Sequence, residues 1–171
     1  HIDLILGDER LRHALCEINT FADGSKDSTL YWLLKKNTLI ETQIDLILED
    51  DNLKKALCEM TTFPDGAKIS PLYRLLEKNN LSEAHINLIL GDDNLRKALC
   101  KMITFYGSKF SPLYWLLQKN NLSEAHIDLI LEDDNLKKAL CKMNAFNDGT
   151  RTLPILHLSF QNYNTHKDKI I

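Results

Sequence analysis

The amino-acid sequence repeats itself with a period of about 42 residues. A segment that reads Ile-Asp-Leu-Ile-Leu, with Asn for Asp in the third copy, begins at residues 2, 44, 86 and 127, so successive copies lie 42, 42 and 41 residues apart. Self-similarity at such a period is typical of repeat proteins, in which each unit covers the apolar face of its neighbour. The sequence therefore predicts one repeat domain, with units at 1–42, 43–84, 85–125 and 126–171.

Each unit is predicted to form three short helices, and residues 70–102 show the signals most clearly. Ser70 and Pro71 supply a hydroxyl cap and a proline at the first helical position, and Asn79 ends that helix. Ser82 caps a second helix and Asp92 opens a third. No stretch alternates with period two, so we expect no β-sheet. The predicted fold class is all-α, an α-solenoid of tandem three-helix repeats.

Helices of this length are not stable alone in water, so stacking between units must hold them. The last unit replaces the aromatic segment of its relatives with residues 153–157 and then continues as a polar tail, which is typical of a capping repeat. The chain begins inside a unit, and we expect it to be a fragment of a longer chain.

The first helix of each unit resembles that of an ankyrin repeat, which opens with Thr-Pro-Leu-His. The matching residues are Ser70-Pro71-Leu72-Tyr73 and Ser111-Pro112-Leu113-Tyr114. Leucines replace the usual alanine pair, Asn replaces the Gly between helices, and an Asp-Asp-Asn-Leu-Lys-Lys segment stands where a β-hairpin is usual. Three helices per unit are also similar to an armadillo repeat. The resemblance implies a solenoid that recognises proteins on one curved face.

Charge and cysteine spacing exclude several other classes. A net charge of -3 and a pI near 6.1 provide no attraction for nucleic acid, and no apolar run is long enough to cross a membrane. The four cysteines, Cys16, Cys58, Cys100 and Cys141, lie too far apart in the chain for a zinc site. We interpret them as buried reduced thiols, which favours a reducing compartment such as the cytoplasm.

The repeated polar residues are interpreted as structural rather than catalytic. His1, His85 and His126 occupy one position of the repeat, which Gln43 takes in the second unit. A catalytic site breaks symmetry, so we expect these side chains to form hydrogen bonds near the start of a helix. The repeated Asp-Asp-Asn lacks the spacing of a calcium loop and is expected to cap helices. The sequence indicates no enzyme, no metal and no cofactor.

Positions at which the copies differ are the candidates for recognition. One set follows the repeated Phe, at residues 22, 64, 106 and 147, and a second lies further along the same loop, at residues 27, 69, 110 and 152. A third follows the repeated Tyr of the first helix, at residues 32, 74 and 115. Trp and Arg are enriched at binding hot spots, and Tyr106 and Phe110 are expected to form an exposed aromatic patch. In the alternative interpretation, the two tryptophans pack against the adjacent unit. The predicted partner-binding residues are Trp32, Arg74, Tyr106, Phe110 and Trp115.

The sequence thus predicts a protein–protein interaction module whose partner is unknown. One alternative is a spacer or self-association segment of a larger protein. An enzyme would need symmetry-breaking polar residues in one cleft, and only His157 and His166 offer them. The composition and the close similarity of the copies also suggest a further alternative, an effector that an intracellular bacterium delivers into a host cell.

Overall fold

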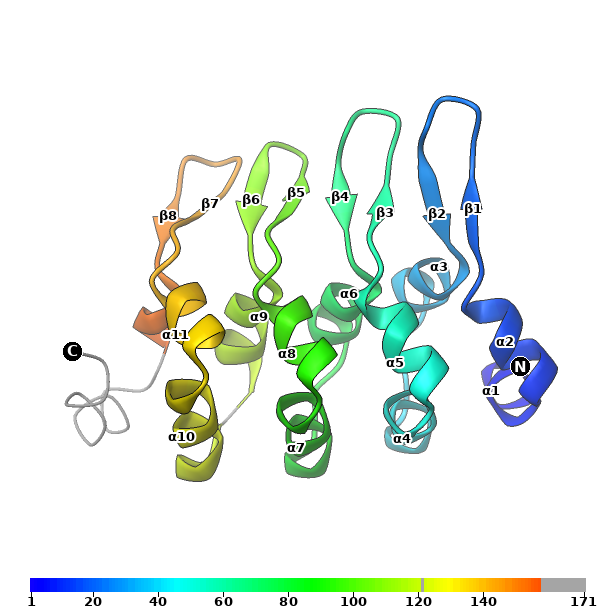
Figure 1. Ribbon diagram of the computed structural model, residues 1–171, viewed down its shortest axis with the longest axis horizontal. Coiled ribbons are helices and arrows are strands. Elements are labelled where there is room, and N and C mark those ends of the chain that lie inside the picture. Colours follow the sequence, from blue (N-terminus) through cyan, green and yellow to red (C-terminus); the bar gives the residue numbers. More distant parts are fainter. Residues whose placement is uncertain (121, 158–171) are drawn as a thin grey trace.

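A computed structural model describes residues 1–120 and 122–157. Within them, eleven α-helices, eight β-strands and one 3₁₀ helix follow each other along the chain (Figure 1). The helices are α1 Ile2–Gly7, α2 Glu9–Leu15, α3 Thr29–Lys36, α4 Glu41–Glu49, α5 Asp51–Cys58, α6 Pro71–Lys78, α7 Glu83–Gly91, α8 Asp93–Leu99, α9 Pro112–Lys119, α10 Glu124–Glu132, α11 Asp134–Leu140 and η1 Pro154–His157. The strands are β1 Ile18–Thr20, β2 Lys26–Ser28, β3 Thr61–Thr62, β4 Lys68–Ile69, β5 Ile103–Phe105, β6 Ser108–Phe110, β7 Asn144–Ala145 and β8 Arg151–Thr152.

The expected all-α fold is wrong, because the chain also forms an antiparallel sheet of eight strands in sequence order. The two strands of each unit pair as a hairpin. In the first hairpin, for example, Ile18 pairs with Ser28 and Thr20 pairs with Lys26. Neighbouring hairpins are joined through single residue pairs such as Lys26 with Thr62. The strands are two or three residues long, so none is long enough to show alternation with period two. The fold is mixed α/β.

The hairpins form because the sequence places a glycine where the backbone must turn. Gly24, Gly66 and Gly149 each follow an aspartate and adopt φ of 80°, 81° and 86°. Positive φ strains most other residues, and Asp-Gly is a strong hairpin signal. The third hairpin is one residue shorter and turns at Tyr106 and Gly107, both with positive φ. The loop that follows the repeated Phe of each unit is therefore the turn of a hairpin.

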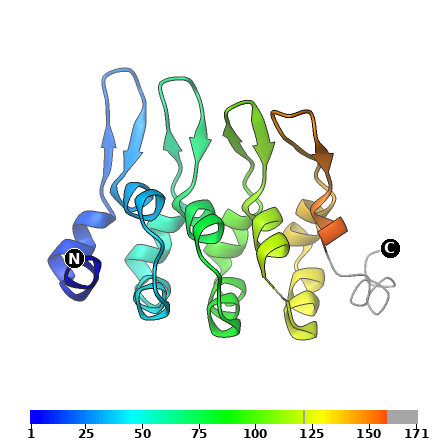
Figure 2. The same ribbon diagram turned by 180° about the vertical axis from the view of Figure 1, so that it is seen from behind.

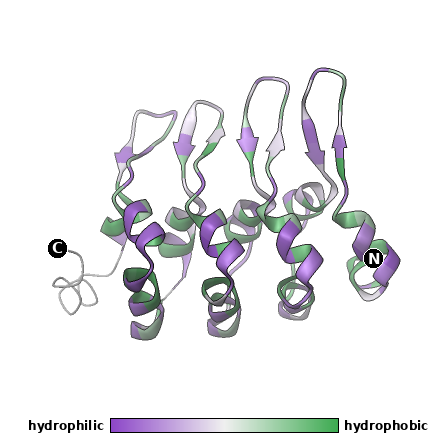
Figure 3. Cartoon of the chain, in the orientation of Figure 1, coloured by the Kyte–Doolittle hydropathy of each residue, from purple (hydrophilic) through white to green (hydrophobic). Residues whose placement is uncertain are grey.

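The helices stack in a row, and all four hairpins project from the same side of it (Figures 1 and 2). Leucine, isoleucine and alanine side chains from successive units form one continuous core between the helices. A second cluster of tyrosine, isoleucine and phenylalanine lies where the hairpins meet the helices. Hydrophilic residues colour much of α5, α8 and α11 in Figure 3. The apolar faces are thus covered by neighbouring units, as expected for stacked repeats.

The helix boundaries agree with the sequence signals, with one difference in conformation. The Ser70 hydroxyl accepts a hydrogen bond from the Tyr73 backbone N–H, with Pro71 at the start of α6. Asn79 ends this helix with φ of -120°, in the extended region rather than in the left-handed region that is common at helix ends. Its side chain is buried, and its Oδ1 accepts a hydrogen bond from the Leu39 N–H of the preceding unit at 2.7 Å. Asn79 therefore also joins two units.

The repeated aspartates cap helices, as predicted. Asp8, Asp50, Asp92 and Asp133 each accept two backbone N–H bonds at the start of α2, α5, α8 and α11. Three of them also form an ion pair with a basic side chain of the preceding unit. These pairs are Arg12–Asp50, Lys54–Asp92 and Arg96–Asp133, with nitrogen–oxygen distances of 3.1, 3.6 and 3.0 Å. Each partly exposed pair contributes at most about 1 kcal/mol. These three ion pairs between successive units therefore fix the register of the units more than they stabilise them.

The cysteines are free, but the expectation that all four are buried is wrong. Cys58 ends α5, and the other three follow the last residue of α2, α8 and α11. Cys16, Cys58 and Cys100 are half-buried, and Cys141 is exposed. Burial raises the pKa of Cys58 and Cys100 to about 11, which keeps these thiols protonated at neutral pH. Among the described residues, no helix has the length and apolar character needed to cross a membrane.

Candidate functional site

The variable positions that the sequence singled out for recognition gather on one side of the molecule. Positions 22, 64, 106 and 147 lie in the hairpin turns, and positions 27, 69, 110 and 152 lie on the second strand of each hairpin. Positions 32, 74 and 115 lie on α3, α6 and α9, the helices directly after the hairpins (Figure 2). The hairpins and these three helices, which we call the hairpin face, therefore carry all three sets of variable positions.

The structure places the five predicted binding residues at very different depths. Tyr106 is 72% exposed, at the tip of the third hairpin. Trp32 and Trp115 are half-buried, and both pack against aromatic rings of an adjacent unit, as the alternative interpretation expected. Arg74 and Phe110 are only 5% and 3% exposed. The expectation that Phe110 is exposed is wrong, because its ring stacks on that of Phe146 in the next hairpin.

Arg74 lies at the centre of a polar network inside the aromatic cluster. Its Nη1 donates to Glu77 Oε2 at 2.5 Å, and its Nη2 donates to the Tyr31 hydroxyl at 3.0 Å. The guanidinium lies 5.0 to 5.3 Å from the ring centroids of Tyr31, Tyr73 and Phe105. The Tyr73 hydroxyl donates to the other Glu77 oxygen at 2.7 Å. Burial and the adjacent Glu77 carboxylate raise the pKa of Tyr73. Arg74 thus holds units together.

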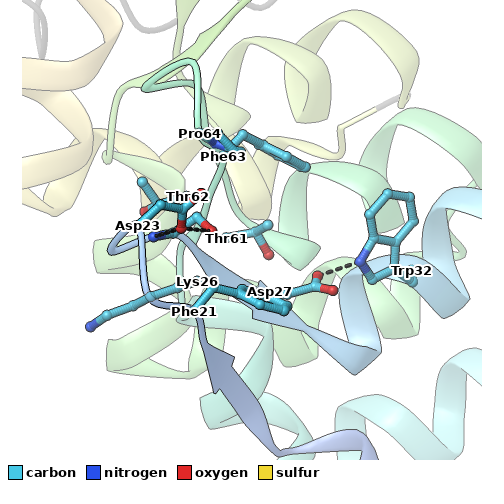
Figure 4. A pocket seen from close by; sticks show the side chains of 10 residues that line it. Phe21, Asp23, Lys26, Asp27, Trp32, Thr61, Thr62, Phe63 and Pro64 are labelled. Carbon is cyan, nitrogen blue, oxygen red and sulfur yellow. Dashed lines mark hydrogen bonds between the residues drawn. The ribbon is translucent and has the colours of Figure 1, made fainter.

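Position 32 is arranged differently, around an open pocket between the first two hairpins (Figure 4). The Trp32 indole N–H donates a hydrogen bond to the Asp27 carboxylate. The pocket has a volume of about 310 Å³. It is lined by Trp32 and by Phe21, Asp23, Ser25, Lys26, Asp27, Thr61, Thr62, Phe63 and Pro64. Three aromatic side chains and two carboxylates therefore share one solvent-accessible hollow, which the sequence had not singled out.

The corresponding tryptophan of the third unit has no such acceptor. Phe110 occupies the place of Asp27, and the buried Nε1 of Trp115 has no hydrogen-bond partner among the described residues. Trp115 packs instead against Phe110 and Tyr73, with centroids 6.3 and 5.9 Å apart. The same residue type thus faces a carboxylate in the first unit and an aromatic ring in the third.

Tyr106 lines a second hollow, between the second and third hairpins. This pocket of about 290 Å³ is lined by residues 65–67 and 104–109. The Tyr106 backbone has φ of 45°, the only positive value at a non-glycine residue in the described part of the chain. Its ring packs on Phe105 at 4.1 Å between centroids but stays exposed. Both hollows therefore open between hairpin tips.

Two of the three repeated histidines, His85 and His126, form the hydrogen bonds near a helix start that their repetition predicted. His85 Nδ1 accepts the Ser82 N–H at 3.2 Å, and its Nε2 lies 2.8 Å from Asp45 Oδ1 of the preceding unit. His126 repeats this arrangement with Ser123 and Asn87. His1 forms no such side-chain cap at the start of α1.

The described residues contain no group of three or more His, Cys, Asp or Glu that could hold a metal ion. His157 packs edge-on against Tyr114, and desolvation lowers its pKa. His166 lies outside the described residues. Comparisons with family models, with curated proteins and with solved structures found no match to this chain.

Proposed function

We propose that this chain is an ankyrin-like repeat module that binds a partner protein through the hairpin face and performs no catalysis. The observation that carries the proposal is that three sets of positions at which otherwise similar units differ lie together on this face. A specific partner can be met by positions that vary from unit to unit, and Tyr106 and Trp32 are aromatic residues at such positions that are not fully buried. Free cysteines favour a reducing compartment, either the cytoplasm of the producing cell or that of a host.

The geometry of Tyr106 supports this proposal. A tyrosine at φ of 45° strains the backbone, while the other hairpins turn through Asp-Gly without that strain. The strain holds a large aromatic ring in solvent, which costs hydrophobic free energy as well. Strained residues persist where they serve a function, and exposed Tyr is enriched at protein interfaces. An aromatic contact with a partner would account for both costs.

Affinity capture from a cell lysate tests the proposal. The variant carries Trp32→Ala and Tyr106→Ala, because neither side chain is fully buried. Arg74 and Phe110 stay unchanged, since replacing buried residues would also lower the stability of the hairpin face. The matched control is Leu88→Ala, which removes an exposed apolar side chain from α7, at the ends of the units away from the hairpins.

A partner retained by the native chain and by the control, but lost by the double variant, would support recognition on the hairpin face. Circular dichroism and urea unfolding must show that the variants are folded. If the double variant captures the same proteins as the native chain, or if the native chain captures none, the proposal fails. The array would then be assigned a spacer or self-association role.

A further inference from the structure

The pocket between the first two hairpins combines aromatic walls with negative charge. Trp32 and Phe63 stand nearly perpendicular, at 84°, with 6.4 Å between their ring centroids. Phe21 adds an exposed ring from the turn of the first hairpin. Ring faces carry partial negative charge and attract cations, and Trp does so most strongly. The pocket walls therefore favour a flat or cationic group.

The carboxylate of Asp27 is oriented toward this space. Its Oδ1 accepts the Trp32 indole N–H, and no described side chain forms an ion pair with it. Lys26 also lines the pocket, but in Figure 4 its ammonium points away from Trp32. Hydrogen bonds from the Ser25 hydroxyl and N–H lower the pKa of Asp23, so this second carboxylate is ionised at neutral pH. Among the residues that line the pocket, two carboxylates thus stand against one ammonium group, that of Lys26.

Asp27 is also what distinguishes this pocket from the rest of the hairpin face. Ile69, Phe110 and Thr152 occupy the equivalent position of the other units. The Asp23 position, in contrast, carries aspartate in three hairpins, where it accepts a turn N–H as Asp65 and Asp148 do. Asp27 has no such turn contact. Its carboxylate therefore needs an explanation other than the shape of the hairpin.

The molecule contains its own example of a cation in such surroundings. One unit further along, the guanidinium of Arg74 lies among three aromatic rings and pairs with the Glu77 carboxylate. The first pocket presents the same elements, aromatic faces and a carboxylate, without an arginine of the chain inside it. Lys35 places its ammonium 4.4 Å from the Trp32 ring centroid, within the range of a cation–π contact. Lys35 is not among the residues that line the pocket.

We propose that the pocket formed by Phe21, Trp32, Phe63 and Asp27 binds an arginine side chain of the partner protein. This inference rests on the proposed recognition function and names the group that is recognised. A guanidinium is planar, stacks on aromatic faces and donates hydrogen bonds to carboxylates, which matches the aromatic walls and the carboxylate of this pocket. The ammonium of lysine lacks the planar face. The free oxygen of Asp27 is the acceptor.

The test uses N-acetyl-arginine-methylamide as the probe and the matching citrulline compound as the uncharged control. Binding is followed by Trp32 fluorescence in a Trp115→Phe chain and by amide NMR shifts. We expect the arginine probe to bind weakly, with a dissociation constant on the order of 1 mM, and the citrulline probe at least about tenfold more weakly. Amide shifts should concentrate on the first two hairpins and α3.

Two variants make the test specific. Asp27→Asn keeps an oxygen that can accept the Trp32 N–H but removes the charge, so we expect about tenfold weaker binding of the arginine probe. Lys35→Gln removes a competing cation, so binding should strengthen about twofold to threefold. Unfolding curves of both variants should match that of the native chain, because neither side chain is buried in the core.

Equal binding of the arginine and citrulline probes, or unchanged binding by Asp27→Asn, would overturn the inference. A lysine probe that bound as tightly as arginine would overturn the assignment to a guanidinium. The two proposals fail separately. If the probe does not bind but the lysate partner is captured and depends on the hairpin face, recognition stands and the arginine pocket falls. If the probe binds through Asp27 and no partner is captured, the recognition function falls.

Discussion

The guanidinium of Arg74 donates a hydrogen bond to the hydroxyl of Tyr31, with 3.0 Å between Nη2 and Oη, across the boundary between two successive units. Both side chains are buried, and the same guanidinium pairs with Glu77 on its own helix. Because the buried charge is paired and surrounded by aromatic rings, its cost of desolvation is offset locally. The contact therefore couples the first unit to the second.

Arg74→Leu is expected to lower the free energy of unfolding by about 2–3 kcal/mol, because the Tyr31 hydroxyl and one oxygen of the Glu77 carboxylate lose their hydrogen bonds to the guanidinium. Urea denaturation measures this change. The control Lys78→Ala, an exposed residue of the same helix, should stay within about 0.5 kcal/mol. A buried ion pair can sometimes be replaced by apolar packing without loss. An Arg74→Leu chain as stable as the native chain would therefore contradict the coupling role.

The histidine position offers a substitution that the chain has already made. Gln43 accepts the Ile40 N–H through Oε1 and donates to Asp3 through Nε2, which are the two contacts that His85 makes with Ser82 and Asp45. His85→Gln is therefore expected to change the free energy of unfolding by less than about 0.5 kcal/mol. His85→Leu removes both contacts from a buried position and should cost about 1–3 kcal/mol. Equal costs in thermal or urea unfolding would exclude this role.

Alkylation should distinguish the cysteines. With a pKa of about 11, the Cys58 and Cys100 thiols are ionised to only on the order of one part in a thousand at pH 8, and the thiolate is the reactive form. Iodoacetamide should therefore modify the exposed Cys141 first. Peptide mass spectrometry resolves the four sites, and their rates should converge in denaturant. Modification of Cys58 ahead of Cys141 in the folded chain would show that the helix ends open readily.

The sequence predicted the helices well because caps and apolar spacing are local signals. Ser70 with Pro71 marks the start of α6, and Asp92 marks the start of α8, as the structure shows. The hairpins were missed because strands of two or three residues carry no periodicity, although the Asp23-Gly24 dipeptide and its equivalents indicate a hairpin turn. Turn chemistry should therefore outweigh periodicity in repeats of this length.

Side-chain depth on the hairpin face could not be predicted from one unit alone. Phe110 is buried by Phe146 of the next hairpin, and Arg74 is buried by residues of the preceding and following units. Such contacts depend on how far one unit rotates against the next, which no local pattern specifies. The sequence does contain one signal for the pocket. Asp27 is the one charged residue at a position that is Ile, Phe or Thr in the other units.

Tyr106 is expected to trade stability for recognition. Asn tolerates the left-handed conformation better than Tyr, so Tyr106→Asn should raise the free energy of unfolding by about 1 kcal/mol while capture of the partner falls. Tyr106→Ala removes the ring but keeps a side chain strained at positive φ, so it should lose capture without gaining stability. Urea unfolding and affinity capture on the same three chains separate strain from contact. A more stable Asn variant that still captured the partner would show that the strain serves no contact with the partner.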